Sequence, residues 1–178
     1  MQRTLLNELA GHYREHRQMA FLSGPRQVGK TTLAKALTDL FPGSEYLNWD
    51  NQAHRAVILD GPQAVASRLG LERLLPSPPL CAFAELHKYR HWRNFLKGFF
   101  DQHESRARIL VTGSASLATF SRGGDSLMGR YFPYRCIRYP WANAWAAWPV
   151  AGSWANPRRS TMTDGRRCGA SAASPNPS

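Results

Sequence analysis

A glycine-rich stretch between residues 24 and 32 has the residue types and the spacing of a phosphate-binding loop. It reads GPRQVGKTT and fits the pattern G-x-x-x-x-G-K-[ST], with Gly24, Gly29, Lys30 and Thr31 at the fixed places. Glycines let the backbone curl so that successive N–H groups point at phosphate oxygens, and a following helix adds the positive end of its dipole. We expect Lys30 to reach the β- and γ-phosphates and the Thr31 hydroxyl to bind Mg²⁺. The residues predicted to bind the nucleotide are Gly24, Pro25, Arg26, Gln27, Val28, Gly29, Lys30, Thr31 and Thr32.

The segments on either side of this loop favour the same interpretation. Residues 19–23 (MAFLS) are mostly apolar, which is typical of a buried parallel strand. After the loop, apolar residues at 33, 34, 37 and 40 recur at helical spacing until Phe41-Pro42-Gly43 ends the helix. The order strand, loop, helix is the one that a P-loop requires. Residues 3–17 predict an amphipathic helix that packs beside the first strand.

The chemistry of a P-loop enzyme also needs acids at the end of a second buried strand, and this chain supplies one of two. Residues 80–84 (LCAFA) predict that strand, where one acid usually holds Mg²⁺ and the next prepares the attacking water. The chain has Ala84 at the first position and Glu85 at the second. We therefore assign Glu85 as the candidate base and expect the metal to be less well held.

Three further positions are candidates to contact the nucleotide. Residues 107–111 predict another strand, and Thr112 or Ser114 at its end would sense the γ-phosphate or the attacking water, although a plain Gly-Ser turn is the alternative. Arg130 is a candidate to touch nucleotide in a neighbouring subunit, within a short helix predicted over residues 125–130. Asp50 follows a strand predicted over residues 45–49, where it either caps the next helix or faces the nucleotide.

Five segments together resemble the prokaryotic AAA+ type P-loop ATPases that carry a C-terminal domain of unknown function. They are GPRQVGKTT at 24–32, YLNWD at 46–50, ELHKYRHWRNFLKG at 85–98, VTGSAS at 111–116 and GGDSLMGRYFPYR at 123–135. The resemblance implies a mainly parallel α/β sheet flanked by helices, in which the acid-bearing strand and the P-loop strand flank the sensor strand. It also implies ATP and Mg²⁺ as ligands and ATP hydrolysis as the activity, and it is compatible with a homo-oligomer. The family pattern reads Asp-Glu before Leu-His-Lys, so Ala84 predicts that ATP binding survives better than hydrolysis.

The resemblance stops at Arg135, and the composition changes there. Residues 1–135 hold 19 leucines, whereas residues 136–178 hold none, and four of the six tryptophans fall in this second part. We therefore expect a truncated ATP-binding domain over residues 1–135 and an irregular tail over 136–178, which is read out of frame or is a flexible basic arm that stacks tryptophans on nucleic acid. A lost strand would leave one edge of the 19–23 strand unpaired and the protein poorly soluble, although residues 134–139 alternate enough to take part of its place.

Composition leaves two other classes of function open. The net charge of +11 and the pI of about 10.3 suit an anionic partner, so a nucleic-acid-binding module in which nucleotide is only structural is one alternative. An inactive remnant of a longer ATPase is the other. Three cysteines without a C-x-x-C pair indicate neither a disulfide framework nor a zinc site. No apolar run reaches the length of a membrane span, and we expect a cytoplasmic protein.

Overall fold

The computed structural model describes residues 2–114, 127–138 and 145–149. Its helices and strands alternate along the chain, as in α/β proteins. In chain order they are α1 (Gln2–Glu15), β1 (Met19–Ser23), α2 (Lys30–Thr38), β2 (Glu45–Asn48), α3 (Gln52–Leu59), α4 (Pro62–Arg68), β3 (Leu80–Ala84), the 3₁₀ turn η1 (Leu86–Lys88), α5 (Trp92–His103), β4 (Arg108–Gly113), β5 (Tyr131–Arg138) and β6 (Trp145–Pro149). None of the helices in the described ranges is long and apolar enough to cross a membrane.

The strands form one sheet in the order β2-β3-β4-β1-β5-β6. The first five are parallel, and β6 pairs antiparallel with β5. The prediction of a mainly parallel P-loop ATPase sheet is confirmed, and the sensor strand β4 lies between the acid-bearing strand β3 and the P-loop strand β1 as expected. β1 lies inside the sheet, between β4 and β5. Ligands of such folds bind just beyond the carboxyl ends of the strands, so the loop that follows β1 lies where a ligand is expected.

The prediction of an unpaired edge on β1 is wrong. β5 pairs with β1 along its whole length, from Met19 opposite Tyr131 to Ser23 opposite Arg135, and it continues to Arg138. β6 then covers the outer edge of β5, from Arg138 opposite Trp145 to Tyr134 opposite Pro149. The expectation that residues 134–139 take part of the place of a lost strand agrees with β5, whereas β6 lies in a tail that was expected to be irregular. The rest of residues 136–178 lies outside the described residues.

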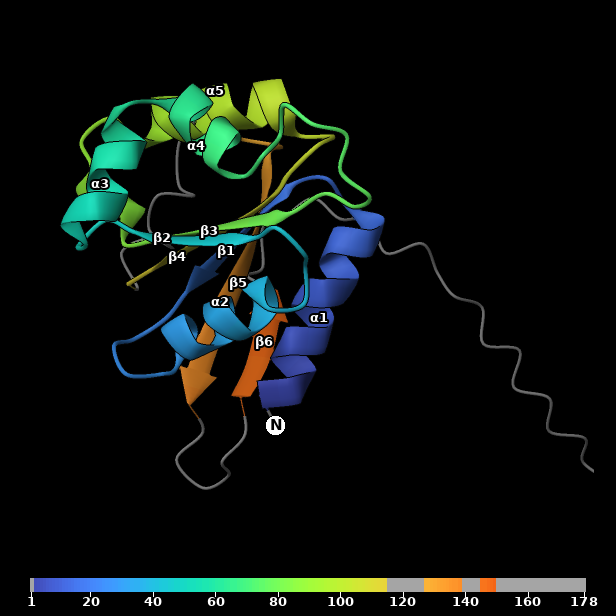
Figure 1. Ribbon diagram of the computed structural model, residues 1–178. Coiled ribbons are helices and arrows are strands. Elements are labelled where there is room, and N and C mark those ends of the chain that lie inside the picture. Colours follow the sequence, from blue (N-terminus) through green and yellow to red (C-terminus); the bar gives the residue numbers. More distant parts are fainter. Residues whose placement is uncertain (1, 115–126, 139–144, 150–178) are drawn as a thin grey trace, which may run out of the picture.

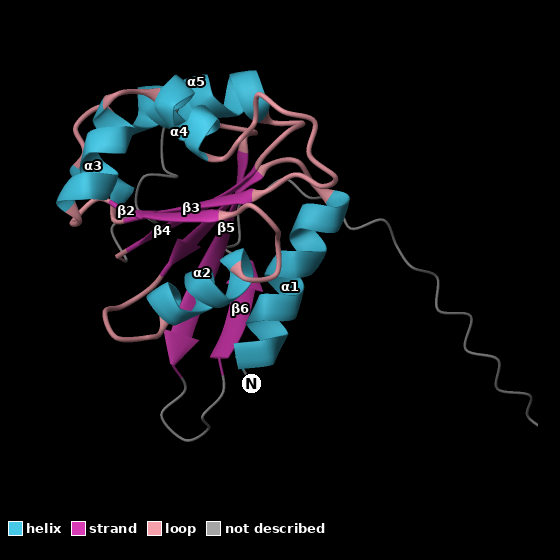
Figure 2. Cartoon of the chain, in the orientation of Figure 1, coloured by secondary structure: helices cyan, strands magenta, loops and turns pink. Residues whose placement is uncertain are grey.

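Helices cover both faces of the sheet, giving three layers. Figure 1 shows α3, α4 and α5 on one face, and α1 and α2 on the other. The same layering, with the strands sandwiched between the helices, is clear in Figure 2. β1 and β3 are buried at every position and are mostly apolar, as parallel strands covered on both faces usually are.

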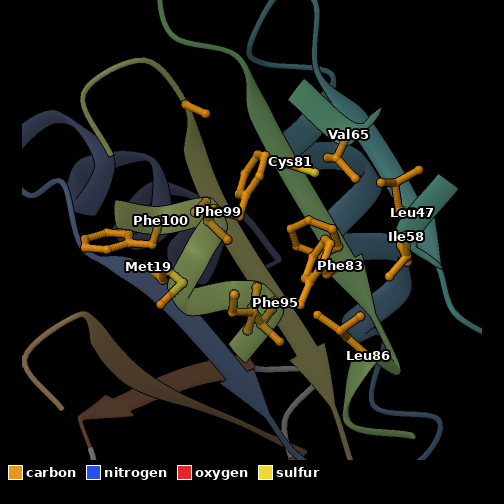
Figure 3. Packing of buried hydrophobic residues seen from close by; sticks show 14 of the residues in the cluster. Met19, Leu47, Ile58, Val65, Cys81, Phe83, Leu86, Phe95, Phe99 and Phe100 are labelled. Atoms are coloured by element: carbon orange, nitrogen blue, oxygen red, sulfur yellow. The ribbon is translucent and has the colours of Figure 1, made fainter. Parts of the chain in front are cut away.

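Alternate residues of the strands face the two helical layers. On the side of α3, α4 and α5, Phe83 packs edge-on against Phe95 and Phe99 of α5 (Figure 3). On the other side Leu22 and Leu110 pack with the apolar face of α1 and α2. Burial of these side chains holds the strands in one register, because a slip of one residue would exchange the two faces.

The segment after β2 differs in detail from the prediction. The residue that caps α3 is Asn51, whose side-chain oxygen accepts from the N–H groups of Ala53 and His54. Asp50 is therefore not the cap, and its carboxylate is available for another partner. Residues 127–130 form a turn that precedes β5, so these four residues do not adopt the helix predicted over residues 125–130.

Candidate nucleotide-binding site

The loop between β1 and α2 has the backbone geometry of a phosphate cradle. Gln27 and Gly29 adopt left-handed conformations, with φ of 61° and 84°. In anion-binding loops such conformations direct successive backbone N–H groups toward the ligand. Gly29 also occupies the N-cap position of α2 without a side-chain cap, so the first N–H groups of the helix have no side-chain acceptor there. These donors and the helix dipole suit an anion.

Gly24 begins this loop because no larger residue fits. A Cβ built on Gly24 would lie 2.3 Å from the carbonyl oxygen of Cys136, which is far inside van der Waals contact. The Cys136 thiol in turn donates to the carbonyl of Val28 at 3.6 Å, so β5 contacts the loop at two points. Burial raises the pKa of this thiol, with Lys30 acting in the opposite direction. The role of Cys136 as a support of the loop could not be predicted, because nothing in the sequence links residue 136 to residue 24.

The ammonium group of Lys30 lies over the start of the loop. It donates to the carbonyl oxygens of Gly24 at 2.8 Å and Pro25 at 2.5 Å. Burial lowers the pKa of Lys30, while Cys136 and the carboxylate of Glu85 raise it. Glu85 follows β3, and only β4 separates β3 from β1, so its carboxylate lies at the same rim of the sheet as Lys30. The predicted phosphate-binding lysine and the predicted base are therefore brought to one place.

Thr31 lies one residue further along, exposed at the start of α2. Its neighbour is the phenol of Tyr46 on β2, whose pKa is raised by burial, lowered by a hydrogen bond with Thr31, and raised further by Glu85 and Asp50. Tyr46 thus lies among the candidate Mg²⁺ ligand and two carboxylates. Sequence reasoning missed Tyr46, because an aromatic residue in a strand is more often part of the core.

The end of β3 places Ala84 and Glu85 as the sequence predicts. Ala84 is buried and lies opposite Asn48 of β2 and Thr112 of β4. Glu85 has a left-handed backbone, with φ of 56° and ψ of 20°, and its N–H donates to the carbonyl of Thr112 at 2.9 Å. Non-glycine residues in this conformation are uncommon and cluster at functional sites. The Ala84 side chain has no metal-ligating atom, and no group of three or more potential metal-binding side chains occurs in the part of the chain that the structure describes.

The two sensor candidates lie at the end of β4, between the loop strand and the acid strand. Thr112 is buried opposite Leu22 of β1 and Ala84 of β3, whereas Ser114 follows the strand and is partly exposed. Both lie at the edge of the sheet where Glu85 and the phosphate loop meet. The geometry does not choose between them.

Arg130 is at the opposite end of the sheet from this site. Its carbonyl accepts from the N–H of Met19 at the start of β1, whereas the loop follows the end of that strand. Its guanidinium pairs with Asp101 of α5, at 2.7 Å between Nε and Oδ1. Five residues of strand separate the two positions by about 16 Å, so Arg130 does not contact the nucleotide site of its own chain. Its action in a neighbouring subunit stays a prediction.

Three side chains beside Glu85 form a charged group that sequence reasoning did not assemble. Lys88 of η1 binds both oxygens of Asp50 and approaches Glu85, and the imidazole of His87 lies near the same Glu85 oxygen. The pairing of Asp50 with Lys88 depends on the adjacency of β2 and β3, which no local sequence pattern indicates.

The geometry agrees with the comparison to protein families. A family model described as an AAA domain matches residues 16–140, which include the phosphate loop, the acid strand, the sensor strand and β5. No curated protein matches the chain.

Proposed function

Because the chain belongs to the AAA domain family, a family of nucleotide-binding ATPase domains, we propose that it binds ATP with Mg²⁺ and hydrolyses it weakly or not at all. The observation that carries the proposal is the loop itself. Gly24 has no room for a side chain, Gln27 and Gly29 turn the backbone inward, and Lys30 holds its ammonium over the cradle. Together these features suit a polyphosphate.

Each residue of the site has a role in this proposal. Lys30 and the N–H groups of residues 24–32 bind the phosphates, and Thr31 supplies a hydroxyl to Mg²⁺. The metal neutralises the charge that develops on the transferred phosphate. Glu85 accepts a proton from the attacking water, and Ser114 or Thr112 orients that water or the γ-phosphate.

Ala84 is the proposed cause of weak hydrolysis. An acid at this position usually acts on the metal through its water shell, and loss of such a group typically costs about 10–100-fold in metal affinity or activity. Ala84→Asp should therefore raise ATP turnover by about that factor while affinity for the adenine nucleotide changes little. An unchanged turnover in a folded Ala84→Asp protein would show that the defect lies elsewhere.

The decisive test of nucleotide binding is thermal stabilisation by MgATP. A ligand present at 100 times its Kd stabilises the folded protein by about 2.7 kcal/mol, which is several degrees in Tm for a domain of this size. Lys30→Ala should abolish the shift, and Lys97→Ala, which removes an exposed lysine on α5, should preserve it. Survival of the shift in Lys30→Ala would remove the P-loop assignment.

Nucleic acid is the partner in a rival proposal that follows from the net charge of +11. Phosphate contacts would give a steep fall of affinity with salt. Tight binding of single- or double-stranded DNA with such a slope, in a protein whose Tm does not respond to MgATP, would favour the rival. A homo-oligomer, which AAA domains often form, would be detected by light scattering with and without MgATP.

A further inference from the structure

We propose that Lys88, held in place by Asp50, is a positioning residue for the carboxylate of Glu85. The inference rests on the proposed function, because it takes Glu85 to be the group that prepares the attacking water. It concerns a lysine and an aspartate to which the P-loop chemistry described above gives no part.

Lys88 contacts two carboxylates at different distances, Asp50 closely and Glu85 less closely. Its Nζ lies 2.6 Å from Oδ2 and 2.8 Å from Oδ1 of Asp50, so the ammonium is held firmly by that carboxylate. The same Nζ lies 3.5 Å from Oε2 of Glu85. Asp50 therefore fixes the ammonium, and the ammonium in turn acts on one oxygen of Glu85.

A second group approaches the same oxygen. The Nε2 atom of His87 lies 3.9 Å from Oε2 of Glu85, and the Nδ1 atom of His87 is buried without a hydrogen-bond partner among the described residues. In the part of the chain that the structure describes, Oε1 of Glu85 has neither a hydrogen bond nor an ion pair. One oxygen of the carboxylate is thus occupied, and the other is left to accept a proton.

The backbone alone does not orient this carboxylate. Its N–H bond to Thr112 and its left-handed conformation fix the Cα of Glu85, but the side chain beyond it rotates about three bonds. Asp50 follows β2 and its N–H donates to the side-chain oxygen of Asn48, while Lys88 ends the turn after β3. The chain of charges from Asp50 through Lys88 to Glu85 therefore ties the candidate base to a neighbouring strand.

Lys88 remains charged over the pH range in which such an enzyme would work. The hydrogen bond to Asp50 raises the pKa of Lys88, and the charges of Asp50 and Glu85 raise it further. Because the lysine touches the base and not the phosphate loop, its loss should lower the rate of the chemical step without weakening nucleotide binding. A misplaced catalytic group costs on the order of 10- to 100-fold in rate.

The experiment uses the full chain carrying Ala84→Asp, in which turnover is expected to be measurable. Into it are introduced Lys88→Met, Lys88→Arg, Asp50→Asn and the pair Asp50→Asn with Lys88→Met. We expect Lys88→Met to lower kcat by about 10-fold or more with KM for ATP and the MgATP-induced Tm shift unchanged. Lys88→Arg should restore most of kcat. Once Lys88 is lost, Asp50→Asn should add little, because the two act in series. Lys97→Met is the matched control and should leave kcat unchanged.

Three results would overturn the proposal. The first is an unaltered kcat in the Lys88→Met protein. The second is a rise in the KM of the Lys88→Met protein for ATP while its kcat stays unchanged. The third is an Ala84→Asp protein whose turnover survives Glu85→Gln, because Glu85 would then not be the base. Loss of the proposed function itself would look different, since the protein without any substitution would then show no MgATP-induced Tm shift.

Discussion

The two ends of the β-sheet handle their polar groups differently. At the carboxyl rim, defined by the loops after β1, β3 and β4, two non-glycine residues have left-handed backbones, and they are the only such residues in the described ranges. In the described ranges Oε1 of Glu85 has no protein partner, and the loop before Lys30 contributes Gln27 and Gly29 with positive φ. At the amino rim, defined by the residues that precede the strands, Arg108 and Arg130 are paired with neighbouring groups.

Arg108 illustrates the amino rim. Its guanidinium donates to the carbonyls of Pro78 and Tyr13, and it lies 4.5 Å above the centre of the Phe41 ring. Desolvation by burial lowers the pKa of this arginine, and Tyr13 acts in the opposite direction. Arg108, at the start of β4, therefore links β4 to α1 and to the segment that precedes β3. The contrast teaches that the left-handed non-glycine backbones of the described ranges lie where a ligand is expected, whereas residues such as Arg108 at the far rim join neighbouring elements.

The largest effect on nucleotide binding and stability is expected from Gly24→Ala at the carboxyl rim. The new Cβ would lie 2.3 Å from the backbone oxygen of Cys136, so the loop or β5 must move. We expect loss of the MgATP-induced Tm shift and a loss of unfolding free energy of about 1–3 kcal/mol from overpacking. Differential scanning fluorimetry with and without MgATP measures both.

Gly11→Ala is the matched control. Gly11 lies within α1, and a Cβ there would meet no atom within 4 Å. Replacing a helical glycine by alanine should stabilise the protein by about 0.5–1 kcal/mol and leave the MgATP response intact. If Gly24→Ala and Gly11→Ala both kept that response, the close approach of β5 to the loop would have no bearing on binding.

Much of the carboxyl rim could be predicted from local sequence. The phosphate loop is a contiguous motif whose glycines and lysine have fixed spacing, and the apolar runs before Gly24 and Glu85 are long enough to identify their strands. Because parallel strands end at one edge of a sheet, the meeting of Lys30 with Glu85 followed from the motif.

The rest depended on contacts between distant residues. The partner of β1 is a strand that begins at Tyr131 and continues to Arg138, and the alternation of residues 134–139 indicated only part of it. Trp145–Pro149, which the composition assigned to an irregular tail, forms the strand that pairs with it. The pairing of Asp50 with Lys88 needed the adjacency of β2 and β3, which no local pattern encodes.

The next effect concerns the hydrogen bond that joins α1 to β4. The phenol of Tyr13 is buried and donates to the carbonyl of Ile109 at 2.8 Å. Tyr13→Phe leaves that buried acceptor with one partner fewer and should cost about 1–2 kcal/mol in unfolding free energy. Urea denaturation measures it, and the MgATP-induced Tm shift should be unchanged. A loss of that shift would contradict the division between the two rims.

A smaller effect on stability is expected when the pH is lowered, because of His12 in the last turn of α1. Burial lowers the pKa of His12, whose Nε2 bonds the carbonyl of Gln18 at 2.8 Å and whose Nδ1 lies 3.0 Å from the Tyr134 hydroxyl. The Gln18 bond and the charge of Glu15 act to raise the pKa, and His16 acts to lower it. Because the unfolded chain binds the proton first, stability should fall as the pH drops below about 6.5, at most about 1.4 kcal/mol per pH unit for this one group.

His12→Gln should flatten that slope between pH 7 and 5, whatever it does to the absolute stability. His16→Gln, at an exposed position one turn later, should flatten the slope only in part, because it removes one influence that lowers the His12 pKa and leaves the burial of His12 in place. The Tm measured across pH for the three proteins decides the matter. An equal slope in His12→Gln would assign the acid sensitivity to other groups, such as His103, whose pKa is also lowered by burial and by Arg106.

The smallest effect is expected from Arg130→Ala, and it bears directly on the division between rims. The pair between Arg130 and Asp101 is exposed, and exposed ion pairs contribute little to stability because water and salt screen them. Since Arg130 precedes β5 at the amino rim, its loss should change neither the Tm nor the MgATP-induced shift of a monomer. Action on the site of a neighbouring subunit would appear as a fall in kcat of the Ala84→Asp protein that grows with protein concentration, at constant KM. A weaker MgATP response in dilute Arg130→Ala protein would instead mean that the amino rim reaches the nucleotide site within one chain, which the length of β1 argues against.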